Sequence, residues 1–194
     1  MSDKRAIPFK EAVAVAQQLY TALLPFCERC KVVGSLRRRK ATVGDIEILY
    51  ISRTQDVAVD LFGNTKIVSL AGGAIEAMLD DDIGRGATLR KRQNVKGSEI
   101  WGPLNKLAVH VSSGIPVDLF ATTPENWWNS LVTRTGGKMS NILLCKSAIK
   151  KGWNFEAYGS GFVKQITGER HQSTSEQDVF EFVGLPYREP QYRP

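Results

Sequence analysis

Two acidic residues, Asp45 and Glu47, stand at the start of an otherwise apolar stretch that ends at Ile51. The β-branched, aliphatic and aromatic residues of this stretch follow a Thr-Val-Gly turn signal and predict a β-strand. Because side chains alternate along a strand, both carboxylates should share one face. Neighbouring carboxylates repel each other and lose hydration unless cations neutralise them. The pair therefore predicts a site for two divalent metal ions.

A turn and a basic cluster lie just upstream of the acids. Gly34 and Ser35 follow a short predicted strand that ends at Val33, and they lead into a predicted helical turn over 36–40, Leu-Arg-Arg-Arg-Lys. Free backbone N–H groups, a Ser hydroxyl and arginine forks suit phosphate oxygens. Taken singly, an acid pair or a basic run is commonly a solvated surface. Together they predict a triphosphate on one side and metal-binding acids on the other.

A third acid, Asp118, lies within the short apolar stretch from Ile115 to Phe120. We expect a strand here, in which a charge is disfavoured unless it is paired or bound to metal. A lone acid on a strand is often structural, but the acid pair upstream favours a metal-binding role.

The order of these motifs resembles the nucleotidyltransferase superfamily. More narrowly, GSLRRRKATVGDIEIL is similar to the palm of the family X DNA polymerases, the DNA polymerase beta family, and VDLF is similar to the strand that carries their third acid. The resemblance runs from about residue 30 to the end of the chain, in a reduced form with palm and thumb alone. One departure is Glu47, where the family usually has Asp, so the geometry between two metals can shift.

The resemblance implies roles for these residues. Asp45 and Glu47 would bridge two Mg²⁺ ions, with Mn²⁺ as the other candidate ion, and Asp118 would complete the ligands beside the primer 3′-hydroxyl. The phosphates of the nucleotide would be bound by four residues of the upstream stretch: Gly34, Ser35, Arg38 and Gly44.

The resemblance extends to a thumb that starts near Pro124. Helices are predicted over 125–133 and 139–151, separated by a Thr-Gly-Gly break. In the family, an aromatic-aromatic-Thr-Gly motif lies under the sugar of the incoming nucleotide and helps to exclude ribonucleotides. Here the motif reads Thr133-Arg134-Thr135-Gly136 and lacks both aromatic residues. We therefore expect weak sugar discrimination, with Arg134 contacting phosphate or base.

Nucleotide contacts in this second unit are expected from four residues: Thr133, Arg134, Gly136 and Asn141. Asn141 falls where the family places an Asn that touches the base or its minor-groove edge. The alternative for Asn141 is an ordinary surface position on a helix. The last segment, 154–190, is also similar to the C-terminal end of the family, with a Ser-capped helix over 175–185 that stops at Gly184.

Composition favours a chain that binds a polyanion. The 194 residues, 42% of them hydrophobic, suffice for two small units that share an interface, a palm over 1–122 and a thumb over 123–194. The net charge of +6 is clustered at 37–40, 90–92 and 146–151, which favours nucleic acid. No apolar run could span a membrane and no signal peptide is recognised, so we expect no membrane partner. The expectation is a soluble, intracellular monomer, in the cytoplasm of a prokaryote or a virus-infected cell.

The other elements should position these motifs. Apolar residues at helical spacing predict an amphipathic helix over 8–24 against the palm sheet. A connection follows over 52–65, then a helix over 66–82 and strands over 88–92 and 107–111. Arg90 and Arg92 would share a strand face, either toward a phosphate backbone or as exposed charges. No Gly-rich helix-hairpin-helix pattern occurs near the N-terminus, so the lyase and fingers regions are expected to be absent.

Three cysteines do not suggest a disulfide framework. Cys27 and Cys30 form a lone C-x-x-C without a second pair for zinc, so we expect partly buried thiols, with zinc or redox use as the alternative. His110 and His171 are isolated and receive no role.

The sequence thus predicts an α+β fold, a nucleotidyltransferase palm whose mixed β-sheet is flanked by helices, with a small α/β thumb. The predicted function is a DNA-directed DNA polymerase of DNA repair, which adds dNTPs, and also rNTPs, to a 3′-hydroxyl in gapped or primer-template duplex DNA. Binding should depend steeply on salt, with distributive synthesis. The alternatives are a template-independent nucleotidyltransferase, acting on RNA, a DNA end or a small molecule, and a catalytically dead nucleic-acid-binding module.

Overall fold

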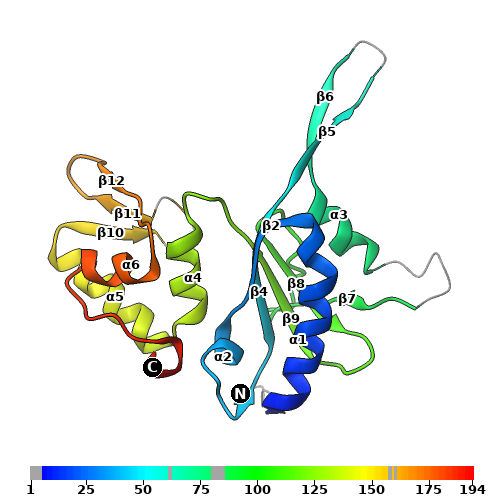
Figure 1. Ribbon diagram of the computed structural model, residues 1–194, viewed down its shortest axis with the longest axis horizontal. Helices are drawn as coiled ribbons and strands as arrows, with labels where there is room; N and C mark the ends of the chain where they lie inside the picture. The colour runs from blue at the N-terminus through cyan, green and yellow to red at the C-terminus, as the bar shows by residue number, and fades with distance from the viewer. Residues whose placement is uncertain (1–5, 61–62, 80–85, 157–158, 160) are drawn as a thin grey trace.

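A mixed five-stranded sheet forms the first lobe of the computed structural model, which describes residues 6–60, 63–79, 86–156, 159 and 161–194 (Figure 1). The strand order is β2-β4-β9-β8-β7, and β4 and β9 are parallel whereas the other neighbours are antiparallel. The bounds are β2 (Cys27–Val32), β4 (Ile46–Ser52), β7 (Leu89–Lys91), β8 (Asn105–His110) and β9 (Pro116–Ala121). The predicted α+β class with a mixed sheet is confirmed.

Helices α1 (Phe9–Leu23) and α3 (Leu70–Ala77) pack on one face of this sheet (Figure 1). The helical spacing in α1 buries Ala12, Ala16, Leu19 and Leu23 against inward-facing strand residues such as Ile48. Cys27 and Cys30 lie in the same core as free thiols. A short turn η1 (Leu24–Phe26) follows α1, and β1 (Ile7–Pro8) pairs with β3 (Thr42–Val43). The opposite face of the sheet is left for the acids and the second lobe.

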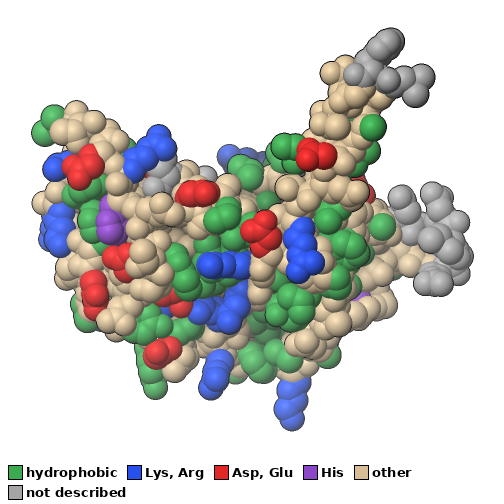
Figure 2. Space-filling view, turned by 45° about the horizontal axis from the view of Figure 1, so that its top comes forward, with side chains coloured by type: hydrophobic (Ala, Val, Ile, Leu, Met, Phe, Trp, Pro, Cys, Tyr) green, Lys and Arg blue, Asp and Glu red, His purple; other side chains and the backbone are tan. Residues whose placement is uncertain are grey.

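The predicted helix over 66–82 is wrong in its first part. Strand β6 (Thr65–Ser69) pairs with β5 (Thr54–Ala58) in a hairpin that projects from the body of the lobe (Figures 1 and 2). The β-branched residues of 65–68 favour the strand, and the helix begins only after Ser69, whose side chain accepts a hydrogen bond from the backbone N–H of Gly72. Residues 80–82 of the predicted helix lie outside the described residues.

The second lobe is an α/β unit with its own core. It comprises α4 (Trp127–Thr135), α5 (Lys138–Lys150), an antiparallel sheet of β10 (Trp153–Glu156), β11 (Gly161–Lys164) and β12 (Arg170–His171), then α6 (Glu176–Phe182) and a final turn η2 (Pro190–Tyr192). Both predicted helices 125–133 and 139–151 are present with small boundary shifts. The Ser175 hydroxyl caps α6, as predicted. Ala157 and Tyr158 of the predicted C-terminal pattern lie outside the described residues.

A third cluster of buried residues joins the two lobes. It combines Leu49 and Phe120, from the open face of the sheet, with Trp127 and Leu131 of α4. The Arg29 guanidinium of β2 also lies over the Trp127 ring, 5.7 Å from its centroid. Helix α4 therefore faces the same sheet surface as the acids. Across the described parts of the chain, no helix is both long and apolar enough to cross a membrane.

Candidate active site

The three predicted acids lie on two neighbouring strands of the open sheet face. Glu47 on β4 and Asp118 on β9 are direct register partners in the parallel pair, and Asp45 precedes β4 by one residue. Adjacent strands in a sheet are about 4.8 Å apart, so these side chains start from neighbouring backbone positions. Alternation places Asp45 and Glu47 on one face, as the sequence predicts, and the register of β9 brings Asp118 to the same face.

The surroundings of Glu47 favour the protonated form of its carboxyl group. Burial, followed by the negative charges of Asp45 and Asp118, raises the pKa of Glu47 to about 7, while Arg134 and Arg38 act in the opposite direction. These causes place two acids and two arginines within electrostatic reach of Glu47. Perturbed carboxyl groups of this kind are typical of functional sites.

The turn at Gly34 lies directly against Glu47. The Val33 N–H donates to the Glu47 carbonyl, at 2.8 Å. Gly34 has a φ of +64°, and a β-carbon at this position would overlap the Glu47 carboxylate. The helical turn predicted over 36–40 begins two residues earlier, as α2 (Gly34–Arg37), and carries the half-buried Ser35. Only glycine fits this close approach.

Two arginines that follow the turn reach the second lobe. Arg38 Nη1 donates to the Thr135 carbonyl at 2.7 Å, and Arg37 Nη1 donates to the Thr135 hydroxyl at 2.7 Å. Arg37 also donates hydrogen bonds to both carboxylate oxygens of Glu176, at 2.8 and 2.7 Å. The Arg38 Nε atom is buried and has no hydrogen-bond partner, so an incoming anion could still be bound there. Sequence analysis missed Arg37, Thr135 and Glu176, because their pairing joins residues far apart in the chain.

Arg92 makes a contact that neither alternative for this arginine pair included. Its side chain forms an ion pair with Asp118, in which Arg92 Nη2 donates to Oδ1. Arg90, on the same strand face, is exposed and lies opposite Val109. Of the two arginines, Arg92 is therefore the one that contacts an acid of the site.

Comparisons with known proteins agree with this geometry. A sequence model described as the DNA polymerase beta thumb matches residues 130–194. The structure resembles that of Leishmania infantum polymerase beta in a ternary P/T complex, with a TM-score of 0.71, 20% identity, and coverage of 98% of this chain and 77% of the other. The ternary gap complex of the same polymerase gives a TM-score of 0.71 at 21% identity, covering 97% and 71%. A search of curated proteins finds no significant match.

The chain has the fold of polymerase beta, and residues 130–194 match its thumb.

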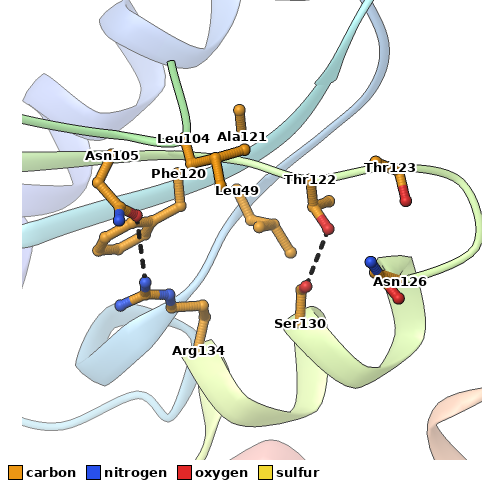
Figure 3. Close-up of a pocket in the computed structure, with 10 residues that line it drawn as sticks. All are labelled: Leu49, Leu104, Asn105, Phe120, Ala121, Thr122, Thr123, Asn126, Ser130 and Arg134. Atoms are coloured by element: carbon orange, nitrogen blue, oxygen red, sulfur yellow. Dashed lines mark hydrogen bonds between the residues drawn. The ribbon is translucent and has the colours of Figure 1, made fainter. Parts of the chain in front are cut away.

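In this polymerase beta-like fold, Arg134 lies at the junction of the lobes. Its guanidinium stacks 3.3 Å from the centroid of the Phe120 ring and donates to the Asn105 side chain at 3.4 Å (Figure 3). These residues line a cavity of about 60 Å³. Ser130 and Thr122 also line it, and their hydroxyl groups are joined by a hydrogen bond of 2.9 Å. The cavity is large enough for only a few water molecules. Phe120 lies two residues after Asp118 on β9, and none of the three acids lines the cavity.

Other predicted thumb residues are engaged inside the second lobe. Thr133 is buried, and its carbonyl accepts a hydrogen bond from the Asn141 side-chain amide at 2.9 Å. A β-carbon at Gly136 would overlap Oδ1 of the Asn141 side chain. Thr133, Gly136 and Asn141 thus stabilise the junction between α4 and α5, and a nucleotide contact would require the Asn141 amide to exchange partners.

The three acids fit a divalent metal by their chemistry. Carboxylate oxygens are hard ligands suited to Mg²⁺ or Mn²⁺, and the mutual repulsion around Glu47 is the kind that a cation relieves. Within the described ranges, however, no three acidic, histidine or cysteine side chains are gathered closely enough to hold one ion. A metal held by all three acids would require their side chains to converge.

Proposed function

We propose that this chain is a DNA-directed DNA polymerase that adds nucleotides to a 3′-hydroxyl in short gaps, in DNA repair. The observation that supports this most directly is the register pairing of Glu47 with Asp118 on the sheet face that the second lobe overhangs. These two acids on adjacent strands, together with Asp45 two residues before Glu47, are a donor set for phosphoryl transfer by a two-metal scheme. The polymerase beta fold and thumb support the same reaction class.

Asp45, Glu47 and Asp118 would hold the metal. When bound, Mg²⁺ would neutralise the triphosphate and lower the pKa of the primer 3′-hydroxyl. The chain itself supplies the positioning: β4 and β9 fix the backbone of the acids in one sheet, and the Gly34 turn supports the Glu47 carboxylate from below.

The phosphates of the nucleotide would lie over the turn that precedes the acids. Gly34 and Ser35 would offer backbone N–H groups and a hydroxyl, and Gly44 would lie beside the phosphates. Arg38, with its unpartnered buried Nε, would stabilise negative charge on the leaving pyrophosphate. Thr133, Arg134, Gly136 and Asn141 would contact the nucleotide from the thumb side.

Duplex DNA is the proposed partner. The two structures of Leishmania infantum polymerase beta quoted above are a P/T complex and a gap complex. Figure 2 shows Lys and Arg side chains gathered near the boundary of the two lobes, on one face of the molecule. Contacts of this kind are made mainly with phosphates, so affinity should fall steeply with salt and synthesis should be distributive.

We also propose that the chain divides into a palm over 1–122 and a thumb over 123–194. Support comes from two separate groups of buried residues, one around β4 and β9 and the other around Val132, Leu144 and Phe162. The thumb match starts at residue 130, just inside the second unit.

The test is primer extension on a duplex with a one-nucleotide gap, with each dNTP and rNTP given separately with Mg²⁺. Asp118→Ala is the test variant, and Asp56→Ala, an exposed acid on the hairpin, is the matched control. Template-matched addition that Asp118→Ala abolishes and Asp56→Ala retains would support the proposal. Addition without regard to template would instead indicate a terminal nucleotidyltransferase. DNA binding without addition would indicate a binding module.

A further inference from the structure

Arg92 and Asp118 belong to one row of residues that crosses the open sheet face. The register places Arg92 beside Leu107 of β8, Leu107 opposite Asp118 of β9, and Asp118 opposite Glu47 of β4. Arg92 therefore reaches across Leu107 to the carboxylate. Its Nε also donates to the Ala108 carbonyl at 3.2 Å, which fixes the direction of the side chain.

The ion pair is largely shielded from water. The side chains of Arg92 and Asp118 retain 23% and 16% of their exposure. Charge-assisted hydrogen bonds between an arginine and a carboxylate are among the stronger ones in proteins. In this arrangement, Asp118 Oδ1 is bound to a guanidinium, and an oxygen in this state is a poor ligand for a cation.

The same guanidinium is well placed for a second anion. Strand β7 forms the edge of the sheet, and Arg90, which is exposed, lies on the same face two residues earlier. A phosphodiester that lies along this edge would meet both arginines. A phosphate can therefore compete with Asp118 for Arg92.

We propose that Arg92 is a positioning residue that withholds Asp118 from divalent metal until a primer-strand phosphate draws the guanidinium away. The inference rests on the proposed function. Binding of DNA and binding of metal are then positively coupled, and the coupling is reciprocal. The site completes its metal ligands only on a primer, which limits reaction of the nucleotide with water in the absence of DNA.

Metal affinity of the protein alone gives the first test. Free Mn²⁺ is followed by electron paramagnetic resonance during titration of wild type, Arg92→Gln and Arg90→Gln, each shown to be folded by its thermal melt. Arg90→Gln removes the same charge from the same face without touching Asp118. We expect Arg92→Gln to bind Mn²⁺ about tenfold more tightly than wild type, within the usual range of coupling between sites, and Arg90→Gln to bind as wild type does. Equal or weaker binding by folded Arg92→Gln overturns the proposal.

DNA affinity gives the reciprocal test. Fluorescence anisotropy with a dideoxy-terminated gapped duplex is measured with and without Mn²⁺. Wild type and Arg90→Gln should gain about tenfold in DNA affinity from Mn²⁺, and Arg92→Gln should gain much less. The same gain in Arg92→Gln as in wild type overturns release by phosphate, even if the first test succeeds. Failure of the proposed function would be seen separately, as absence of nucleotide addition by wild type, while the Mn²⁺ titration still reports on Arg92.

Discussion

The α-carbon of Gly34 lies so close to the Glu47 carboxylate that a β-carbon at position 34 would overlap Oε2. The turn that leads toward the proposed phosphate site and the strand that carries the acids are thus in direct contact. The hydrogen bond from the Val33 N–H to the Glu47 carbonyl holds the two segments in this register. A change in one segment must therefore displace a side chain of the other.

Gly34→Ala should reduce both stability and activity. The left-handed φ of Gly34 costs an L-residue about 1–2 kcal/mol, and the added methyl group must also push the Glu47 carboxylate aside. Gly97→Ala is the matched control, because Gly97 has a φ of +79° with nothing within 4 Å of its β-carbon position. Denaturant unfolding should show a larger loss for Gly34→Ala, and gap filling should fall only in that variant. Equal losses in the two variants would contradict the close approach.

The raised pKa of Glu47 predicts a pH-dependent stability difference. Folded, metal-free protein keeps Glu47 protonated up to about pH 7, whereas in the unfolded chain the group ionises near its ordinary pKa of about 4.3. The stability from this group is therefore fully present below about pH 4.3 and is lost as pH rises through 7, an effect on the order of 3 kcal/mol. Glu47→Gln should melt above wild type at pH 8 and show a smaller difference at pH 5.

Glu28→Gln serves as the control for this comparison, since Glu28 is an exposed carboxyl on the neighbouring strand β2. Its difference from wild type should not change between the two pH values. A constant difference between wild type and Glu47→Gln across pH 5 to 8 would show that Glu47 is ionised throughout. Mg²⁺ should stabilise wild type at pH 8 more than Glu47→Gln, because a cation relieves the repulsion only where the charge is present.

Local pattern was sufficient for the acid strands and failed for the long-range pairings. Asp45 and Glu47 could be placed on one face because alternation along a strand is a local property, whereas Asp118 was assigned to the site only through the family resemblance. Nothing in the sequence says that Arg92 rather than Arg90 meets Asp118, since this depends on the register of β7 against β8 and β9. The hairpin of β5 and β6 was missed because its exposed strands lack the apolar alternation that marks a half-buried strand.

Glu176→Gln should destabilise the contact between the lobes. Burial alone would raise the pKa of Glu176, but the hydrogen bonds from Arg37 and Arg193 outweigh it and lower this pKa. Arg193 is fully buried, and its Nη1 donates to Glu176 at 2.9 Å. Loss of the shared carboxylate leaves a buried guanidinium without its counter-charge, which costs about 3–5 kcal/mol.

The measurement is the free energy of unfolding of Glu176→Gln at pH 7, beside Glu181→Gln, an exposed acid on the same helix. The control should lie within about 0.5 kcal/mol of wild type. Because the pKa of Glu176 is lowered, the stability it provides is present above its unfolded pKa and is lost as pH falls. The gap between wild type and Glu176→Gln should accordingly narrow in acid, and a gap that widens would reverse the assigned sign.

Weak discrimination between dNTPs and rNTPs is expected from the thumb motif. The positions that carry aromatic residues in the related polymerases hold Thr133, which is buried, and Arg134, which is stacked on Phe120. Neither side chain supplies an aromatic surface against the sugar, so a ribose 2′-hydroxyl meets no bulky barrier from them. The ratio of kcat/KM for a dNTP over its rNTP should be about a hundredfold or less, the scale of discrimination against an added hydroxyl without a dedicated steric or hydrogen-bonding contact. The ratio is measured on one enzyme sample with the same gapped duplex, so the active fraction cancels.

Arg134→Ala should lower kcat/KM for both nucleotides together if Arg134 contacts phosphate, leaving the ratio unchanged. A dNTP preference of a thousandfold or more in wild type would show that another part of the chain excludes the ribose.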